Sequence, residues 1–95
     1  MKSYIYSNKS ILAEVNILNH KLPSRQTQRI NSLGGGSMLV QGNTVPGSVI
    51  FEVPVGIDLF NQRNLEIDLN DRTYRLEISG ERYMSGVRVI TGMIY

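Results

Sequence analysis

Apolar and polar residues alternate along most of this chain, which is the pattern of β-strands with one buried face. In residues 11–18 every second residue is apolar (Ile11, Ala13, Val15 and Ile17), and the residues between them are mixed. Two shorter strands are predicted over residues 37–41 and 48–53, separated by the turn-forming pairs Gly42-Asn43 and Pro46-Gly47. The early half of the sequence therefore predicts strands and turns.

The clearest local prediction is a hairpin whose strands are residues 65–69 and 72–78 and whose two-residue turn is Asn70-Asp71. A slip of one residue would carry Glu66 and Asp68 into the core, so the register is well specified. The predicted cross-strand pairs are Leu69 with Arg72, Asp68 with Thr73, Ile67 with Tyr74, Glu66 with Arg75, and Leu65 with Leu76.

Three further segments surround this hairpin. Residues 56–61 are expected to form a turn that tucks Ile57, Leu59 and Phe60 under one end of the sheet. A second turn is predicted around residues 79–86. Residues 87–95 are apolar at nearly every position, which predicts a last strand that is central or buried on both faces.

The tract from His20 to Val45 contains no acidic residue, and three successive glycines occupy residues 34–36 within it. Ser24 is a suitable helix N-cap and Gly34 a suitable helix end. Such a helix would bury only Ile30 and Leu33, which is too little to offset the cost of ordering it. The sequence therefore predicts a long mobile loop over residues 20–37, with at most a turn or two of helix.

These elements predict a single, mainly β domain over residues 1–95, with six to seven strands, one long basic loop and little helix. A small antiparallel β-barrel or sandwich is the matching fold class. Its length of 95 residues suits one domain. There is no Trp and only two Phe, so Ile, Leu, Val and Tyr must fill the core.

Charge is unevenly distributed along the chain. Residues 1–47 hold five basic residues and one acid, and residues 48–95 hold five basic residues and seven acids. The halves therefore carry +4 and −2, in agreement with the net charge of +2. The polarity suits contact with a polyanion or stacking of subunits, although an unevenly charged solvated surface is the commonest explanation.

Residues that carry chemistry are few. The absence of cysteine excludes disulfides, thiolate metal sites and cysteine nucleophiles, and is consistent with a reducing compartment. His20 is the only histidine and lies beside no activated nucleophile. The triple glycine is followed by an apolar strand rather than by the Lys-Ser or Lys-Thr of a phosphate loop. Glu66 and Asp68 are the one carboxylate pair compatible with a hydrolase, but the predicted partners Arg75 and Thr73 explain them structurally. We therefore expect no enzyme, cofactor or metal site.

The N-terminus lacks the apolar region of a signal peptide, and no segment approaches the roughly 18–20 apolar residues of a membrane helix. A cytoplasmic protein without membrane contact is the expectation.

The candidate contact residues are Lys21, Arg25 and Arg29, which lie in the predicted loop. Basic side chains in a polar loop suit contact with a partner protein or with nucleic-acid phosphates. The aromatic residues that single-strand binders combine with such charges are missing from this loop. A small nucleic-acid-binding barrel is accordingly kept as an alternative function.

The order of elements in the second half resembles one family. The segment 49–54, the hairpin 65–78 with its Tyr-centred strand, Gly86 and the final apolar strand 87–95 together resemble the head–tail joining proteins of tailed phages. These include head-closure, neck and tail-completion proteins, which are small β-barrels with long loops. The turn at Asn70-Asp71 departs from the pattern because it lacks a glycine.

The resemblance implies a virion structural protein that forms a ring around the DNA channel and is made in the host cytoplasm. Its partners would be other copies of the same chain, neighbouring virion proteins and DNA in the channel. The segment from Lys21 to Ser37 would project from the barrel and become ordered on docking.

Overall fold

The structure is a computed structural model that describes the backbone of residues 1–31 and 37–95 and the side chains of residues 1–25 and 44–95. Its eight strands are β1 (Lys2–Ser7), β2 (Ser10–Lys21), β3 (Ser24–Asn31), β4 (Ser37–Val45), β5 (Gly47–Val53), β6 (Leu65–Leu69), β7 (Arg72–Met84) and β8 (Val87–Ile94). The described residues include no helix long and apolar enough to cross a membrane.

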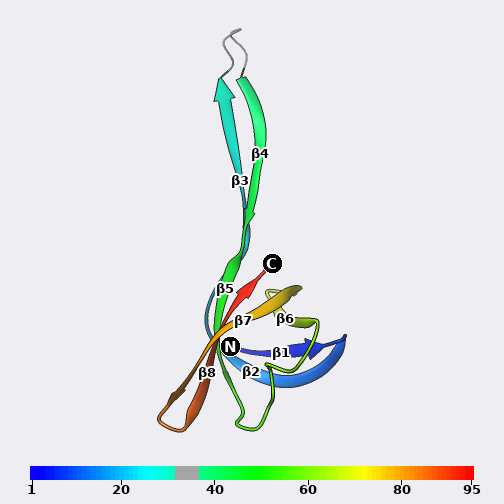
Figure 1. Cartoon of the computed structure of the whole chain (residues 1–95), viewed down its shortest axis with the longest axis vertical. Helices are drawn as coiled ribbons and strands as arrows, with labels where there is room; N and C mark the ends of the chain where they lie inside the picture. The colour runs from blue at the N-terminus through cyan, green and yellow to red at the C-terminus, as the bar shows by residue number, and fades with distance from the viewer. Residues whose placement is uncertain (32–36) are drawn as a thin grey trace.

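Six strands form a closed antiparallel barrel in the order β1-β2-β5-β8-β7-β6, with β6 pairing back to β1 (Figure 1). The mainly β class is confirmed, and the barrel is the correct one of the two architectures that the sequence left open. The remaining strands, β3 and β4, form a separate two-stranded sheet. Closure leaves the barrel strands without a free edge.

The barrel interior is filled by the alternating apolar residues. In β5 and β6 every second residue is buried, as the period of a strand with one dry face requires. Phe51 is fully buried and is the largest side chain of this core. The core residues are Ile5, Val15, Ile17, Val49, Phe51, Val53, Leu59, Leu65, Ile67, Leu69, Leu76, Ile90 and Ile94.

The β6–β7 hairpin has the predicted register from Glu66–Arg75 to Leu69–Arg72. The β6–β7 ladder ends at Glu66–Arg75, so the fifth predicted pair, Leu65 with Leu76, lies one step beyond it in the same register, and on its other side Leu76 pairs with Ile94 of β8. Asn70 and Asp71 both have positive φ, 50° and 63°. Two successive left-handed residues form the type I′ turn that matches strand twist, and Asn and Asp tolerate this region, so the turn needs no glycine.

The prediction for the last strand was wrong in one respect. β8 lies between β5 and β7, but its burial alternates, with Arg88, Ile90, Gly92 and Ile94 inside and Thr91 exposed. Only the inner face of a closed barrel is dry, so a strand in its wall has one buried face. The turn predicted around residues 79–86 is narrower than expected, because β7 continues to Met84 and the chain reverses at Ser85-Gly86.

The connection between β5 and β6 partly follows the prediction. Leu59 is buried and Ile57 is half-buried against the core, but Phe60 is 56% exposed, so the prediction for Phe60 was wrong. The Asp58 carboxylate accepts the backbone N–H groups of Phe60 (3.1 Å) and Asn61 (3.2 Å). This Asx-type turn holds the connection in shape by polar contacts rather than by burial of the second aromatic ring.

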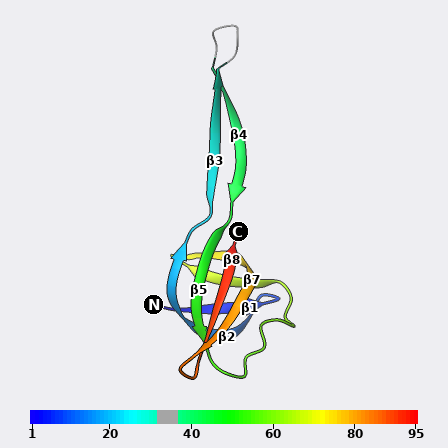
Figure 2. The same cartoon turned by 60° about the vertical axis from the view of Figure 1, so that its left-hand side comes forward.

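The largest correction concerns residues 24–31, which were predicted to be loop and form strand β3 instead. β3 pairs with β4 from Ser24–Val45 to Asn31–Ser37, and this hairpin, here called the arm, projects from one end of the barrel (Figures 1 and 2). The remainder of the predicted loop at 32–36 lies outside the described residues. The molecule measures 61 × 29 × 23 Å, and its radius of gyration is 17.5 Å. A compact domain of this length would have a radius of about 12 Å, so the arm dominates the shape.

Candidate docking surfaces

The arm leaves the barrel through a narrow joint. β2 runs to Lys21 and β3 starts at Ser24, while β4 and β5 are separated by Pro46 alone. Proline donates no backbone hydrogen bond, so Pro23 and Pro46 suit the places where one ladder stops and the next begins. A side chain at Gly47 would collide with the carbonyl oxygen of Lys21 and lie 2.7 Å from the nitrogen of Pro23. The two chain segments of the joint therefore approach closely enough to require glycine.

The predicted contact residues lie on both sides of the joint, because Lys21 ends β2 of the barrel whereas Arg25 and Arg29 belong to β3 of the arm. Lys21 and Arg25 are exposed at its base, on either side of the joint. Arg29 lies opposite Leu39 in the ladder, four residues beyond Arg25, which corresponds to about 13 Å at roughly 3.3 Å per residue. The structure thus places the three residues in two strands, the end of β2 and β3, rather than in a loop.

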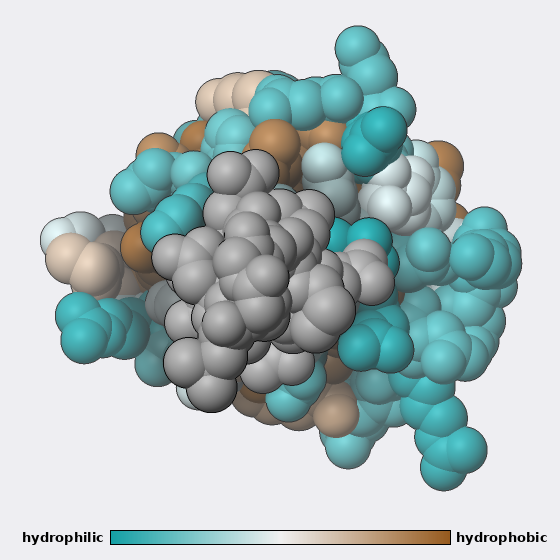
Figure 3. Space-filling view, turned by 90° about the horizontal axis from the view of Figure 1, so that it is seen from above, coloured by the Kyte–Doolittle hydropathy of each residue, from teal (hydrophilic) through white to brown (hydrophobic). Residues whose placement is uncertain are grey.

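A second surface lies at the end of the barrel opposite the arm, where the β7–β8 turn and the start of the β5–β6 connection meet the solvent (Figures 1 and 2). We call this surface, made by Val55, Tyr83, Met84 and Val87, the far end. The four side chains are 71%, 66%, 58% and 38% exposed. The sequence analysis missed them, although large apolar residues on both sides of Ser85-Gly86 were a visible signal. The part of the arm-bearing end that is coloured in Figure 3 is mainly hydrophilic, with scattered apolar residues.

An ion pair between Arg88 and Glu81 lies beneath the far end and holds its two chain segments together. Arg88 is 7% exposed, and its Nε lies 3.2 Å from Oε1 of Glu81. Its two terminal nitrogens donate to Glu81 Oε2 (3.3 Å) and to the carbonyl oxygen of Ile57. The bond to the guanidinium holds the pKa of the Glu81 carboxyl below its usual value. Arg88 therefore links the β5–β6 connection to the β7–β8 hairpin, a role that the sequence analysis did not identify.

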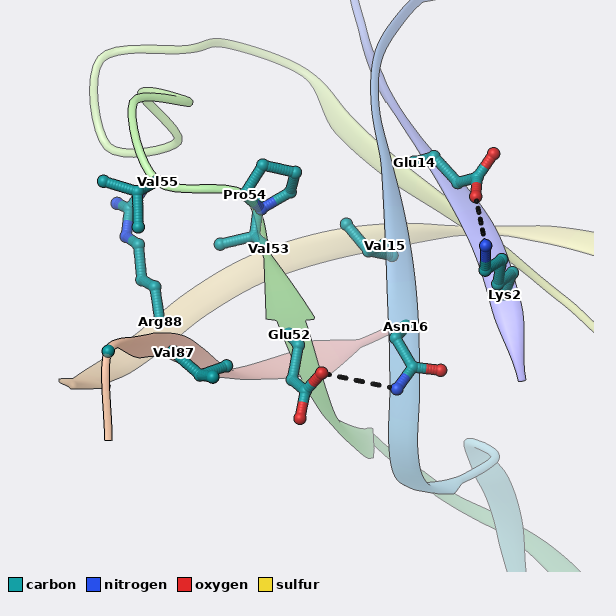
Figure 4. Close-up of a pocket in the computed structure, with 11 residues that line it drawn as sticks. Lys2, Glu14, Val15, Asn16, Glu52, Val53, Pro54, Val55, Val87 and Arg88 are labelled. Carbon is teal, nitrogen blue, oxygen red and sulfur yellow. Dashed lines mark hydrogen bonds and ion pairs between the residues drawn. The ribbon is translucent and has the colours of Figure 1, made fainter. Parts of the chain in front are cut away.

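A shallow pocket of about 340 Å³ opens beside the far end (Figure 4). Its charged and polar side chains lie next to one another in pairs. Lys2 is 3.4 Å from Glu14, and Asn16 Nδ2 donates to Glu52 Oε2 over 3.4 Å. Because Arg88 is bound to Glu81, both cationic side chains that line the pocket, Lys2 and Arg88, have an acidic partner.

The two carboxylates considered for catalysis, Glu66 and Asp68, also have partners within the protein. Asp68 accepts hydrogen bonds from Tyr6 and Thr73, each at 2.6 Å, which confirms the predicted Thr73 contact and raises the pKa of Tyr6. Glu66 is paired with Lys9 at 3.0 Å, so the predicted side-chain pairing with Arg75 is wrong. The Arg75 guanidinium instead stacks 4.8 Å above the Tyr95 ring. The two carboxylates are thus part of a polar ladder on the barrel surface.

His20 lies near the end of β2, where it pairs with Val49 of β5, and its backbone N–H bonds to the Asn19 side chain at 2.9 Å. Among the residues that the structure describes, no group of three or more His, Cys, Asp or Glu side chains is placed to hold a metal ion.

In comparisons with known proteins, no family model, no curated protein and no solved structure matches this chain.

Proposed function

We propose that this chain is a non-enzymatic structural subunit of a virion, of the kind that joins the phage head to the tail. The barrel makes side-by-side contacts in a ring, and the arm docks onto a neighbouring component. The observation that carries this proposal is the arm itself, a two-stranded projection along the longest dimension of the molecule, which measures 61 Å against 29 Å and 23 Å across.

The distribution of free strand edges supports an assembly role for the arm. Every strand of the barrel has a neighbour on both sides, whereas β3 and β4 each have one. A two-stranded hairpin alone in water is marginally stable, and its exposed edges are templates for pairing with another chain. An element of this kind gains stability when a partner covers it, which is the behaviour required of a docking device.

The far end supports the same interpretation. Three of its exposed apolar side chains flank the β7–β8 turn and the fourth, Val55, lies in the β5–β6 connection beside it. Interface cores are enriched in tyrosine and methionine. The molecule therefore offers one distinct surface at each end of its long axis. Subunits with two different ends suit a structure that is built in successive layers.

Electron microscopy of the purified protein in negative stain tests the proposed ring. We expect ring-shaped particles with a central channel, because heterologous contacts between identical subunits close when the rotation between neighbours allows it. A field of single barrel-sized particles at every protein concentration contradicts the proposal. A variant with Tyr83→Ser and Met84→Ser should retain the barrel, and its ring distribution reveals whether the far end takes part in ring contacts or in contacts between layers.

A second function, nucleic-acid binding through the arm, is favoured by Lys21 and Arg25, which are exposed at its base in a tract without acidic residues. The triple variant in which Lys21, Arg25 and Arg29 become alanine should then lose affinity for a duplex DNA of about 20 base pairs. The wild-type affinity should fall with salt with a log–log slope of about −0.9 per neutralised phosphate. An unchanged affinity in the triple variant excludes this function.

A further inference from the structure

The two outer edges of the arm differ in charge. β3 carries Arg25 and Arg29, whereas β4 carries no charged residue from Ser37 to Val45. Charged residues on an edge strand prevent unwanted pairing, and a long uncharged edge with apolar residues invites it. Met38, Leu39 and Val40 give the β4 edge this composition. The β4 edge is therefore the one suited to accept another strand.

The register of the arm restricts the usable part of that edge. Arg25 pairs with Thr44, but Thr27 pairs with Gln41, so β4 has one extra residue in this interval. Such a bulge twists the strand and interrupts regular pairing. Beyond it, the ladder is regular from Thr27–Gln41 to Asn31–Ser37. The regular edge available to a partner is thus the five-residue segment from Ser37 to Gln41.

We propose that this edge binds the same edge of a second copy, so that two arms join in a four-stranded antiparallel sheet of order β3-β4-β4-β3. Antiparallel pairing of identical strands is isologous and places one residue on the two-fold axis. For the regular segment that residue is Leu39, with Met38 opposite Val40 and Ser37 opposite Gln41 of the second copy. This inference rests on the proposed function of the arm and names its partner.

Charge determines which edges meet. Pairing through β3 would bring two arginine-bearing strands to about 4.8 Å, where like charges repel. Pairing through β4 leaves the β3 strands outermost, three strand spacings or about 14 Å apart, which exceeds the screening length of about 8 Å at physiological ionic strength. The arginines then occupy both edges of the completed sheet and stop further growth. The composition of the arm thus favours a closed pair of copies over a fibre.

Site-specific disulfide formation tests the inference, because the chain has no native cysteine. In the L39C variant the two cysteines would face each other across the axis, at the Cα separation of about 4.5–5.5 Å that a disulfide accepts. The matched control is Q28C. Gln28 pairs with Val40 in the same arm but lies on the outer strand. We expect mild oxidation to convert most of L39C to a covalent dimer while Q28C stays monomeric on a non-reducing gel.

A mixture of M38C and V40C measures the register. The proposed pairing places these residues opposite each other in different copies, so the mixed pair should form heterodimers faster than either variant alone forms homodimers. Equal rates for L39C and Q28C, or faster oxidation of Q28C, would overturn the inference. The result is separable from the ring, because L39C can cross-link in a protein that forms no ring and fail to cross-link in one that does.

Discussion

The barrel and the arm are both antiparallel β-structure, but different forces hold them. Each barrel strand pairs on both sides and contributes inward side chains to one core that includes Phe51 and Ile67. The arm consists of a single pair of strands joined by backbone hydrogen bonds in a sheet of its own. The comparison indicates that side-chain burial stabilises the barrel. The stability of the arm depends on a partner that pairs with its strand edges. Substitutions in the two regions should therefore have very different effects.

The largest effect is expected from F51A, which empties the centre of the barrel. Removal of a fully buried phenylalanine side chain costs about 3–5 kcal/mol, which is a large share of the stability of a small domain. The control is F60A, since the other phenylalanine of the chain is 56% exposed and should change stability by no more than about 0.5 kcal/mol. Urea denaturation of both variants measures the difference. Equal losses would contradict the assignment of the core.

The next effect is expected from R88M, which removes the tie between the β5–β6 connection and the β7–β8 hairpin. Breaking a buried ion pair typically costs roughly 3–5 kcal/mol, and the partial exposure of Glu81 places this one near about 2 kcal/mol. The matched control is R82M, because Arg82 is an exposed residue of β7. A loss of stability in R82M as large as in R88M would show that the contacts of Arg88 with Glu81 and Ile57 do not stabilise the fold.

This ion pair also predicts a dependence on pH. The pKa of Glu81 is lowered in the folded protein, chiefly by its bond to Arg88. A lowered folded pKa stabilises the protein above the unfolded value, which is about 4.5, and the contribution is lost as the pH falls through the folded value. The free energy of unfolding of wild type should therefore exceed that of E81Q at pH 7, and the gap should narrow as the pH falls below the unfolded pKa of Glu81 and on through its lowered folded pKa. A gap that widens on acidification would contradict the pairing.

A smaller effect is expected from G47A at the joint. A Cβ there would meet the backbone of Lys21 and Pro23, and strain of this kind costs about 1–3 kcal/mol. G80A is the control, because a Cβ at Gly80 has no atom within 4 Å. G80A should be neutral or slightly stabilising, since glycine weakens a strand. Thermal unfolding of the two variants decides whether the joint requires glycine.

The smallest effect on stability is expected from shortening the arm. Replacing residues 26–43 by Asn-Gly joins the cross-strand neighbours Arg25 and Thr44 through a two-residue turn. The barrel core is untouched, so the unfolding midpoint should stay within a few degrees of wild type. A collapse of the fold in this variant would mean that the arm belongs to the folding unit of the barrel.

The same contrast explains what could be predicted from the sequence. The β6–β7 register followed from alternation, because Ile67 and Leu69 need a buried face that Glu66 and Asp68 must avoid. The arm could not be predicted in this way, since residues 24–31 are nearly all polar and show no alternation of apolar and polar positions. Arg88 was missed because the pattern around it indicated burial, and only the fold reveals that Glu81 and the Ile57 carbonyl surround its guanidinium. Lys21, Arg25 and Arg29 were selected by charge, which identified the segment but not its structure.

The most direct test of the central proposal is the absolute mass of the protein and of the arm-shortened variant, measured by size-exclusion chromatography with light scattering. Copies joined both in a ring and through paired arms have dihedral symmetry, so wild type should form a particle with twice as many copies as the variant. The variant should remain a ring of about six or more copies of the barrel. A chain mass of 10.7 kDa makes these states easy to separate. A wild-type protein that stays monomeric at every concentration and salt would contradict the account of this chain as an assembly subunit.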